Sequence, residues 1–346
     1  MKMHISPLSK IYPQQSPVSF FGCCIRNYND VLAIGARCGS PYDPVGPGFV
    51  DVYINGQYSQ TLKGAAHGER FGVSIALNEQ YLCIGAYREN TGAESGGSVY
   101  VYKRNGNKYG LLNLLYAPDK RHKDYFAYNI AIEGKTLVTG AYAKNIIGGE
   151  DGKAYVFDLD HNKCVSEISN IHPIINENFG RAVCIYDNKI YIGSHKRNKK
   201  GSIYEYDLNG NLLNIFEHAN TKGFGNSIYV DADYVITGAY ESQDNGSVCI
   251  YNKKLNKWKN ITIDGNGSFF GGSISVSKNI IAIGSYRYGQ KERGAVFLYD
   301  VTENKIIDKI IPEIGTAWFG YSVHLNNDKL FVGSVKENLV YTYTLD

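Results

Sequence analysis

The 346-residue sequence lacks long apolar runs and carries little net charge. Its longest apolar blocks, such as residues 280–283, are only strand-sized, so we expect no membrane insertion. The formal charge of +3 is too small to indicate a polyanionic partner, and we expect no nucleic-acid binding. Residues 1–16 do not resemble a secretory signal, because Pro7, Lys10 and Pro13 interrupt any apolar core. The sequence is therefore typical of a soluble protein.

The seven cysteines are odd in number and lack Cys-x-x-Cys spacing. Cys83, Cys184 and Cys249 occupy apolar strand positions, where we interpret them as buried free thiols that act as small hydrophobes. Free thiols favour a reducing compartment, so a cytoplasmic location is expected. A secreted or cell-surface protein, or a fragment of a longer or exported chain, stays open as an alternative.

A Phe-Gly pair recurs along the whole chain and is the dominant feature of the sequence. The copies are Phe21-Gly22, Phe71-Gly72, Phe126-Ala127, Phe179-Gly180, Phe224-Gly225, Phe270-Gly271 and Phe319-Gly320, and successive Phe positions differ by 50, 55, 53, 45, 46 and 49 residues. Between them lie short blocks rich in Ile, Val and Tyr and bounded by Gly, Asn, Asp and Ser, a pattern that indicates strands. In the second copy we expect strands at 73–77, 81–86, 98–102 and 111–116.

Repeats of about 50 residues with four strands each predict an all-β, seven-bladed β-propeller with four-stranded antiparallel blades, spanning residues 1–346 as a single domain. We expect each repeat Phe to wedge between adjacent blades. A small pair on the second strand, such as Gly35-Ala36 or Gly193-Ser194, suits crowded strands near the axis. The last copy lacks a fourth strand, and we expect residues 4–12 to supply it by pairing with residues 339–345, which closes the ring.

The motifs Phe71-Gly72-Val73-Ser74-Ile75-Ala76, Ile84-Gly85-Ala86 and Gly97-Ser98-Val99-Tyr100 resemble the FG-GAP repeat of integrin α-subunit propellers. The resemblance extends over the chain in seven copies and implies seven blades. Integrin-type repeats often carry an Asp-x-Asp-x-Asp-Gly calcium loop between the first two strands. The corresponding hairpins here, such as 78–80 and 277–279, lack the oxygen ligands that calcium requires, so we expect neither a metal nor another cofactor.

In such a blade, the loops between blades and the loops between the second and third strands emerge on one face. The resemblance to integrins implies an aromatic cage on this face that receives a basic side chain from a partner. We therefore predict a partner site that uses aromatic area and cation–π attraction. The candidate residues are Phe20, Tyr125, Phe269 and Trp318 before the repeat Phe, Tyr128 and Tyr321 after the Gly position, and Tyr87, Tyr142, His195, Tyr240 and Tyr286 after the small pair.

Simpler interpretations stand beside this one. The same residues could pack blade against blade and line a narrow channel. The basic run 195–200, with Arg287, Lys291 and Arg293, could bind phosphate or an acidic protein, although a solvated loop is favoured. Four histidines precede Phe-Gly in consecutive loops, but blade-sized separations make joint metal ligation awkward.

No nucleophile elbow, P-loop or His-Glu-x-x-His motif is present, so we predict no catalytic residues and no enzyme activity. Glu69, Asp124 and Glu177, two residues before their Phe, are interpreted as acceptors of loop hydrogen bonds. The leading hypothesis is a monomeric protein-binding module. A lectin-like propeller, with each Tyr stacking on a sugar, and an enzyme with a site in the axial channel are the alternatives.

Overall fold

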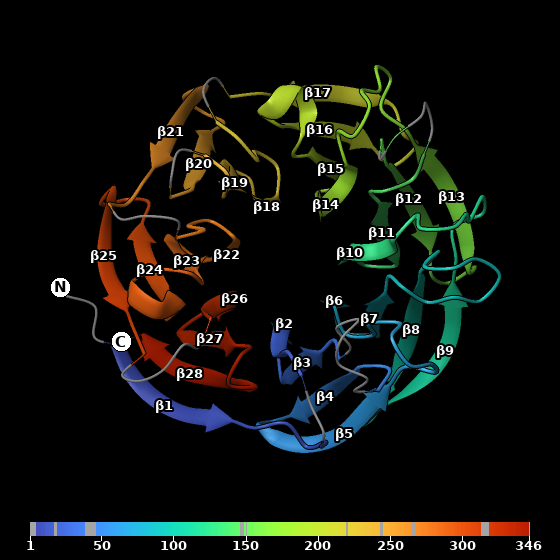
Figure 1. Cartoon of the computed structure of the whole chain (residues 1–346), viewed down its shortest axis with the longest axis horizontal. Helices are drawn as coiled ribbons and strands as arrows, with labels where there is room; N and C mark the ends of the chain where they lie inside the picture. Colours follow the sequence, from blue (N-terminus) through green and yellow to red (C-terminus); the bar gives the residue numbers. More distant parts are fainter. Residues whose placement is uncertain are drawn as a thin grey trace.

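The computed structural model describes residues 5–16, 19–38, 46–145, 149, 151–218, 221–242, 245–264, 268–312 and 318–345. Seven four-stranded antiparallel sheets form a ring, so the chain folds as a seven-bladed β-propeller (Figure 1). Two short 3-10 turns, at Arg197–Lys199 and Gln290–Glu292, lie in the loops. The described part contains no helix that is long and apolar enough to cross a membrane.

Each blade is a meander whose first strand faces the axis and whose fourth strand forms the outer wall. The strands, blade by blade, are β2 (Phe21–Tyr28), β3 (Val31–Ala36), β4 (Phe49–Ile54), β5 (Gln57–Lys63); β6 (Ser74–Leu77), β7 (Tyr81–Ala86), β8 (Ser98–Asn105), β9 (Lys108–Leu115); β10 (Phe126–Glu133), β11 (Thr136–Ala141), β12 (Lys153–Asp158), β13 (Lys163–Ile168); β14 (Phe179–Tyr186), β15 (Lys189–Ser194), β16 (Ser202–Asp207), β17 (Leu212–Phe216); β18 (Ser227–Val230), β19 (Tyr234–Ala239), β20 (Ser247–Asn252), β21 (Lys257–Ile261); β22 (Ser273–Ser277), β23 (Ile280–Ser285), β24 (Ala295–Asp300), β25 (Lys305–Ile310); and β26 (Phe319–Asn326), β27 (Lys329–Ser334), β28 (Leu339–Leu345), β1 (Ile5–Ile11).

The ring closes through the two ends of the chain, as predicted. Strand β1 is the outer strand of the seventh blade and pairs antiparallel with β28, with Ile5 opposite Leu345 and Ile11 opposite Val340. His4, which the prediction included, lies outside the described residues. The Ser9 amide and the Thr342 hydroxyl oxygen are 3.0 Å apart and add a side-chain bond to the pairing. The edge of β28 is thereby covered.

Packing between blades explains the repeat Phe and the glycine of the small pair. All seven repeat Phe side chains are fully buried. Phe71, for example, shares a core cluster with Val50 of the preceding blade and Tyr100 of its own, which confirms the predicted wedge. A Cβ atom added at Gly35 would lie 2.1 Å from the carbonyl oxygen of Gly72 in the next blade. The small pair is therefore required because two backbones approach closely there.

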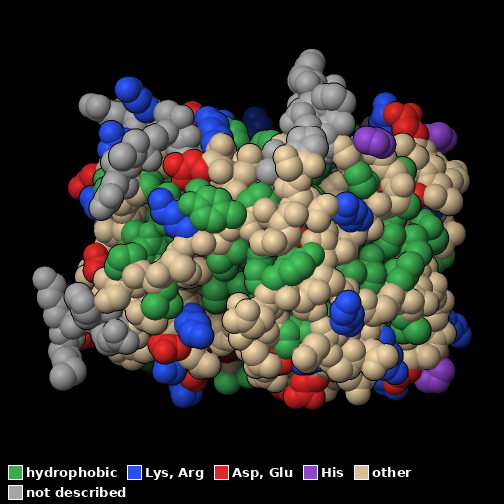
Figure 2. Space-filling view, turned by 90° about the horizontal axis from the view of Figure 1, so that it is seen from below, with side chains coloured by type: hydrophobic (Ala, Val, Ile, Leu, Met, Phe, Trp, Pro, Cys, Tyr) green, Lys and Arg blue, Asp and Glu red, His purple; other side chains and the backbone are tan. Residues whose placement is uncertain are grey.

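The outer wall is more mixed. Leu111 on β9 and Leu213 on β17 are exposed, while the inner strands bury most of their apolar residues. A side view shows apolar side chains on this wall interspersed with acidic and basic ones (Figure 2). None of the seven cysteines, all of which the structure describes, forms a disulfide bond.

Candidate functional site

Three positions in every blade build one face of the ring, which we call the aromatic face. It is the face where the loops between blades and the loops between second and third strands emerge. The position before the repeat Phe holds Phe20, Arg70, Tyr125, Asn178, Gly223, Phe269 and Trp318; the position after the Gly holds Cys23, Val73, Tyr128, Arg181, Asn226, Gly272 and Tyr321; the position after the small pair holds Arg37, Tyr87, Tyr142, His195, Tyr240, Tyr286 and Val335.

The backbone before the repeat Phe is left-handed in all seven blades, with φ between 47° at Trp318 and 75° at Gly223. This conformation turns the chain from the loop into the inner strand. It disfavours side chains other than Gly and Asn, at a cost of about 1 kcal/mol or more each. Four of the seven positions nevertheless carry an aromatic ring. Residues held in disfavoured backbone at one surface are a recognised feature of functional sites.

The predicted aromatic residues meet in two clusters. In the first cluster, Phe269 lies 5.5 Å from Tyr240 and 5.0 Å from Tyr286, measured between ring centres. The contacts continue from Tyr286 to Trp318 at 5.5 Å. Phe20 then lies 6.4 Å from Trp318, across the boundary between the seventh and first blades. We call this chain of rings, which includes Tyr321, the large cluster.

The second, small cluster is formed by four tyrosines of the second and third blades. Tyr87 packs edge-to-face against Tyr125 at 5.6 Å and against Tyr128 at 5.3 Å. Tyr142 closes the group, 4.9 Å from Tyr128. Most rings of both clusters are half-buried, so one edge or face reaches solvent.

Two of the predicted residues are buried rather than presented to solvent. Tyr87 is 5% exposed and His195 is 1% exposed. Burial, together with the nearby Arg181 and Lys196, lowers the pKa of His195 to about 2, so its ring is neutral at physiological pH. Tyr87 supports the face from within through its contacts with Tyr125 and Tyr128.

Arginines of the same chain lie against the rings, and the sequence prediction missed this. The guanidinium of Arg37 is 4.2 Å from the Phe20 ring centre, and that of Arg181 is 4.8 Å from Tyr128. Arg287 lies 4.8 Å from Phe269. Arg37 and Arg181 occupy repeat positions that hold tyrosines in other blades. This equivalence is the sequence signal from which arginines beside the rings could have been predicted. The cations that an aromatic cage attracts are thus supplied by the protein itself.

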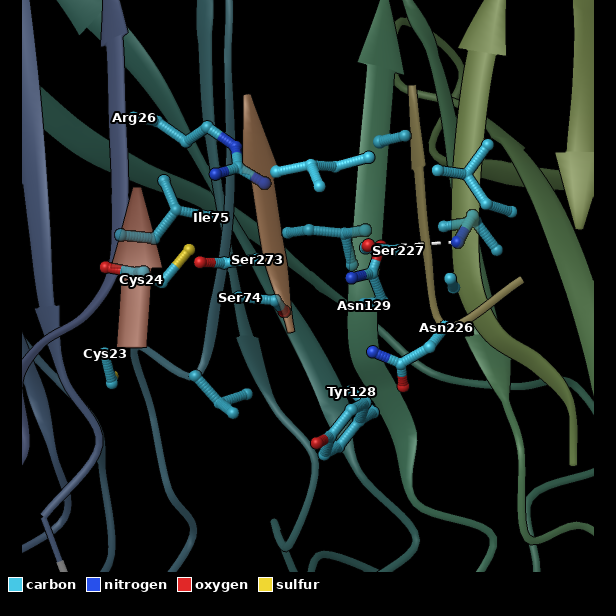
Figure 3. A pocket seen from close by; sticks show the side chains of 18 of the residues that line it. Cys23, Cys24, Arg26, Ser74, Ile75, Tyr128, Asn129, Asn226, Ser227 and Ser273 are labelled. Atoms are coloured by element: carbon cyan, nitrogen blue, oxygen red, sulfur yellow. Dashed lines mark hydrogen bonds between the residues drawn. The ribbon is translucent and has the colours of Figure 1, made fainter. Parts of the chain in front are cut away.

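Beneath the aromatic face, the inner strands enclose a cavity of about 510 Å³ along the axis. Its basic side chains are Arg26, Arg37 and Arg181, and no Asp or Glu of the described chain lines it. Figure 3 shows Tyr128 and Asn226 toward one end of this axial channel and Arg26 toward the other. Its volume is in the range of small-molecule pockets.

Charge compensation differs around the rim. Glu292 accepts a hydrogen bond from the Trp318 indole at 2.8 Å and lies 3.5 Å from Arg287 and 3.6 Å from Lys336. This carboxylate balances the cations beside the large cluster. No such carboxylate is paired with Arg37 or Arg181 in the part of the chain that the structure describes.

The acidic residues two positions before Phe bond to their own loops, as interpreted from sequence. Asp124 pairs with the buried Lys144 at 2.7 Å. Glu177 accepts hydrogen bonds from Asn170 and pairs with Arg197, which belongs to the basic run. Glu69 accepts a bond from the Tyr100 hydroxyl. Among the described residues, no group of three His, Cys, Asp or Glu side chains is arranged to hold a metal ion.

Comparison with known families identifies the repeat. Residues 61–102 and 112–157 match the FG-GAP repeat model; the first segment runs from the end of β5 in the first blade to β8, and the second runs from β9 to β12. A search of curated proteins found no significant match. The chain therefore carries FG-GAP repeats on a seven-bladed propeller, which confirms the resemblance inferred from its motifs.

Proposed function

We propose that this FG-GAP propeller is a non-enzymatic module that binds a partner protein on its aromatic face. The observation that supports the proposal most is the large cluster, where half-buried rings from four blades form a continuous apolar surface. Aromatic side chains of this kind dominate the energetics of protein interfaces. Propellers with FG-GAP repeats commonly serve as interaction modules.

The chemistry of the face favours a partner different from the one that the integrin resemblance implied. A basic side chain from a partner would meet Arg37, Arg181 and Arg287, which already occupy the faces of the rings. Repulsion between like charges would oppose its insertion. The proposed partner therefore contributes apolar or acidic groups.

The lectin and enzyme alternatives have less support. A lectin with one sugar site per blade needs separated rings, whereas these tyrosines pack edge-to-face against one another. A channel enzyme needs a nucleophile or base, but burial raises the pKa of Cys23 and of Cys184, two of the three cysteines that line the channel, to about 12. The channel lining described here contains neither histidine nor carboxylate.

A pull-down with purified chain tests the proposal. The double variant Trp318→Ala/Tyr286→Ala removes the centre of the large cluster and is expected to lose the partner. The control is Tyr28→Ala/Tyr58→Ala, which removes two exposed rings, 37% and 45% accessible, from outside the aromatic face. Capture that is unchanged in the first variant, or lost equally in both, would contradict the proposal.

A further inference from the structure

Within the part of the chain that the structure describes, Arg37 and Arg181 leave most of their hydrogen-bonding capacity unused. Each guanidinium carries five N–H donors. Arg181 makes two long bonds there, both of 3.4 Å, from Nε to Asn226 Oδ1 and from a terminal nitrogen to the Tyr128 hydroxyl. The Arg37 guanidinium lies 4.2 Å from the ring centre of Phe20 and 5.8 Å from that of Tyr321. None of the described residues accepts a hydrogen bond from it. Both residues line the axial channel.

No anion of the described residues compensates the positive charge of this pair. Burial acts to lower the pKa of Arg181, but the surrounding phenols, first among them Tyr128, leave it above the usual value. Burial also raises the pKa of Tyr142 and Tyr321 above the normal range, so these two phenols are neutral at physiological pH. The Arg181 guanidinium is therefore charged while these two neighbours are not.

The two arginines act on one volume although they come from the first and fourth blades. Tyr128 and Tyr321 interact electrostatically with both guanidiniums. Both arginines line the same cavity of about 510 Å³, whose described lining contains no carboxylate. Rings of both aromatic clusters line it, and their low polarity strengthens charge interactions beside them.

We propose that Arg37 and Arg181 form a carboxylate-binding site at the mouth of the axial channel, filled by an acidic side chain of the partner protein. This inference rests on the proposed function for the identity of the partner. Guanidinium groups suit it because their planar donors match the two oxygens of a carboxylate. The rings around the mouth would contact the apolar surface next to the inserted residue. The site thus reverses the charge expected from the integrin resemblance.

The site can be tested without a partner by using glutarate, which carries the same carboxylate group as a glutamate side chain. A ligand that binds only the native state raises the thermal midpoint. Potassium glutarate is expected to raise the midpoint of the wild-type chain above that in potassium chloride at equal ionic strength. Arg37→Gln/Arg181→Gln should abolish the shift, whereas Lys108→Gln, which removes an exposed charge at the β8–β9 turn, should retain it.

Calorimetric titration gives the magnitude. Loss of one charged bond of about 1.5–3 kcal/mol weakens glutarate binding by about tenfold or more in Arg181→Gln. Arg181→Lys keeps the charge without the planar donors, so its affinity for glutarate should lie between those of wild type and Arg181→Gln. These single variants test the site if the double variant fails to fold. Equal glutarate affinity in wild type, Arg181→Lys and Arg181→Gln would overturn the site.

Competition in the pull-down separates this inference from the proposed function. Excess glutarate should release a captured partner, and Trp318→Ala/Tyr286→Ala should lose the partner while retaining the glutarate shift. A partner that glutarate does not displace would overturn the carboxylate site and leave the aromatic-face proposal intact. A glutarate shift with no captured partner would support the site and overturn its assignment to a protein side chain.

Discussion

The guanidinium of Arg181 lies 4.8 Å from the ring centre of Tyr128 in the preceding blade and donates a 3.4 Å hydrogen bond to its hydroxyl. This pair joins an inner strand of the fourth blade, β14, to an inner strand of the third, β10. It supplies the cation that the aromatic cage was expected to take from elsewhere. The face is consequently basic as well as aromatic.

Gly35→Ala should destabilise the protein strongly. The new Cβ would sit 2.1 Å from the Gly72 carbonyl oxygen, and neither backbone can move without separating two blades. We expect a loss of about 3 kcal/mol in the free energy of unfolding, measured by urea denaturation. Gly110→Ala is the control, because no atom lies within 4 Å of its added Cβ. Similar losses for both variants would contradict the close-approach explanation.

Ala127→Gly should stabilise the protein. Ala127 has φ of +69° and replaces the glycine found in the other six copies. Glycine adopts the left-handed backbone without strain, which stabilises the native state, but it also increases the entropy of the unfolded chain, which opposes this gain. The net effect should raise the free energy of unfolding by about 0.5 kcal/mol. Ala131→Gly, in the same strand without a positive φ, should lower it by about 1 kcal/mol. A decrease of the same size in both variants would refute the strain at Ala127.

Glu69 should make stability pH-dependent. Burial raises its pKa from 4.5 to about 7, against the opposing hydrogen bond from Tyr100. The native state therefore holds this proton more tightly than the unfolded state, and its stability falls as pH rises from about 4.5 to about 7. Glu69→Gln has no such proton to lose. As the pH rises across this range, the thermal midpoint of wild type should therefore fall relative to that of Glu69→Gln.

Thermal scans between about pH 5 and pH 8 measure the Glu69 effect. The exposed Glu79→Gln, in the β6–β7 hairpin, serves as the control and should follow the wild-type curve. Parallel curves for Glu69→Gln and wild type would show that Glu69 titrates alike in the native and unfolded states.

Removal of residues 1–11 should weaken ring closure. It deletes β1 and exposes the hydrogen-bonding edge of β28, including the partner of Ser9 at Thr342. We expect a lower thermal midpoint and concentration-dependent self-association, because an open strand edge pairs readily with other strands. Removal of residues 1–4, which precede β1, should have neither effect. Light scattering after size-exclusion chromatography is the measurement, and a monodisperse truncated chain with an unchanged midpoint would contradict the role of β1.

The sequence determined the fold, because its signals are local and repeat in phase. Each Phe-Gly pair, each apolar strand and each polar turn is read within about 50 residues, so seven copies define seven blades and the missing fourth strand predicts closure by the amino-terminal segment. The equivalent positions of the repeats also predicted which aromatic residues share one face. They did not predict that these residues group into a large and a small cluster.

Only the tertiary structure decided the charge of the face. Arg37 and Arg181 lie 144 residues apart, and each alone reads as a polar substitution in its repeat. Closing the ring brings both guanidiniums to the same channel mouth, among phenols and with no described carboxylate lining it. Electrostatic interactions depend on distances through space and on burial, neither of which repeat spacing specifies.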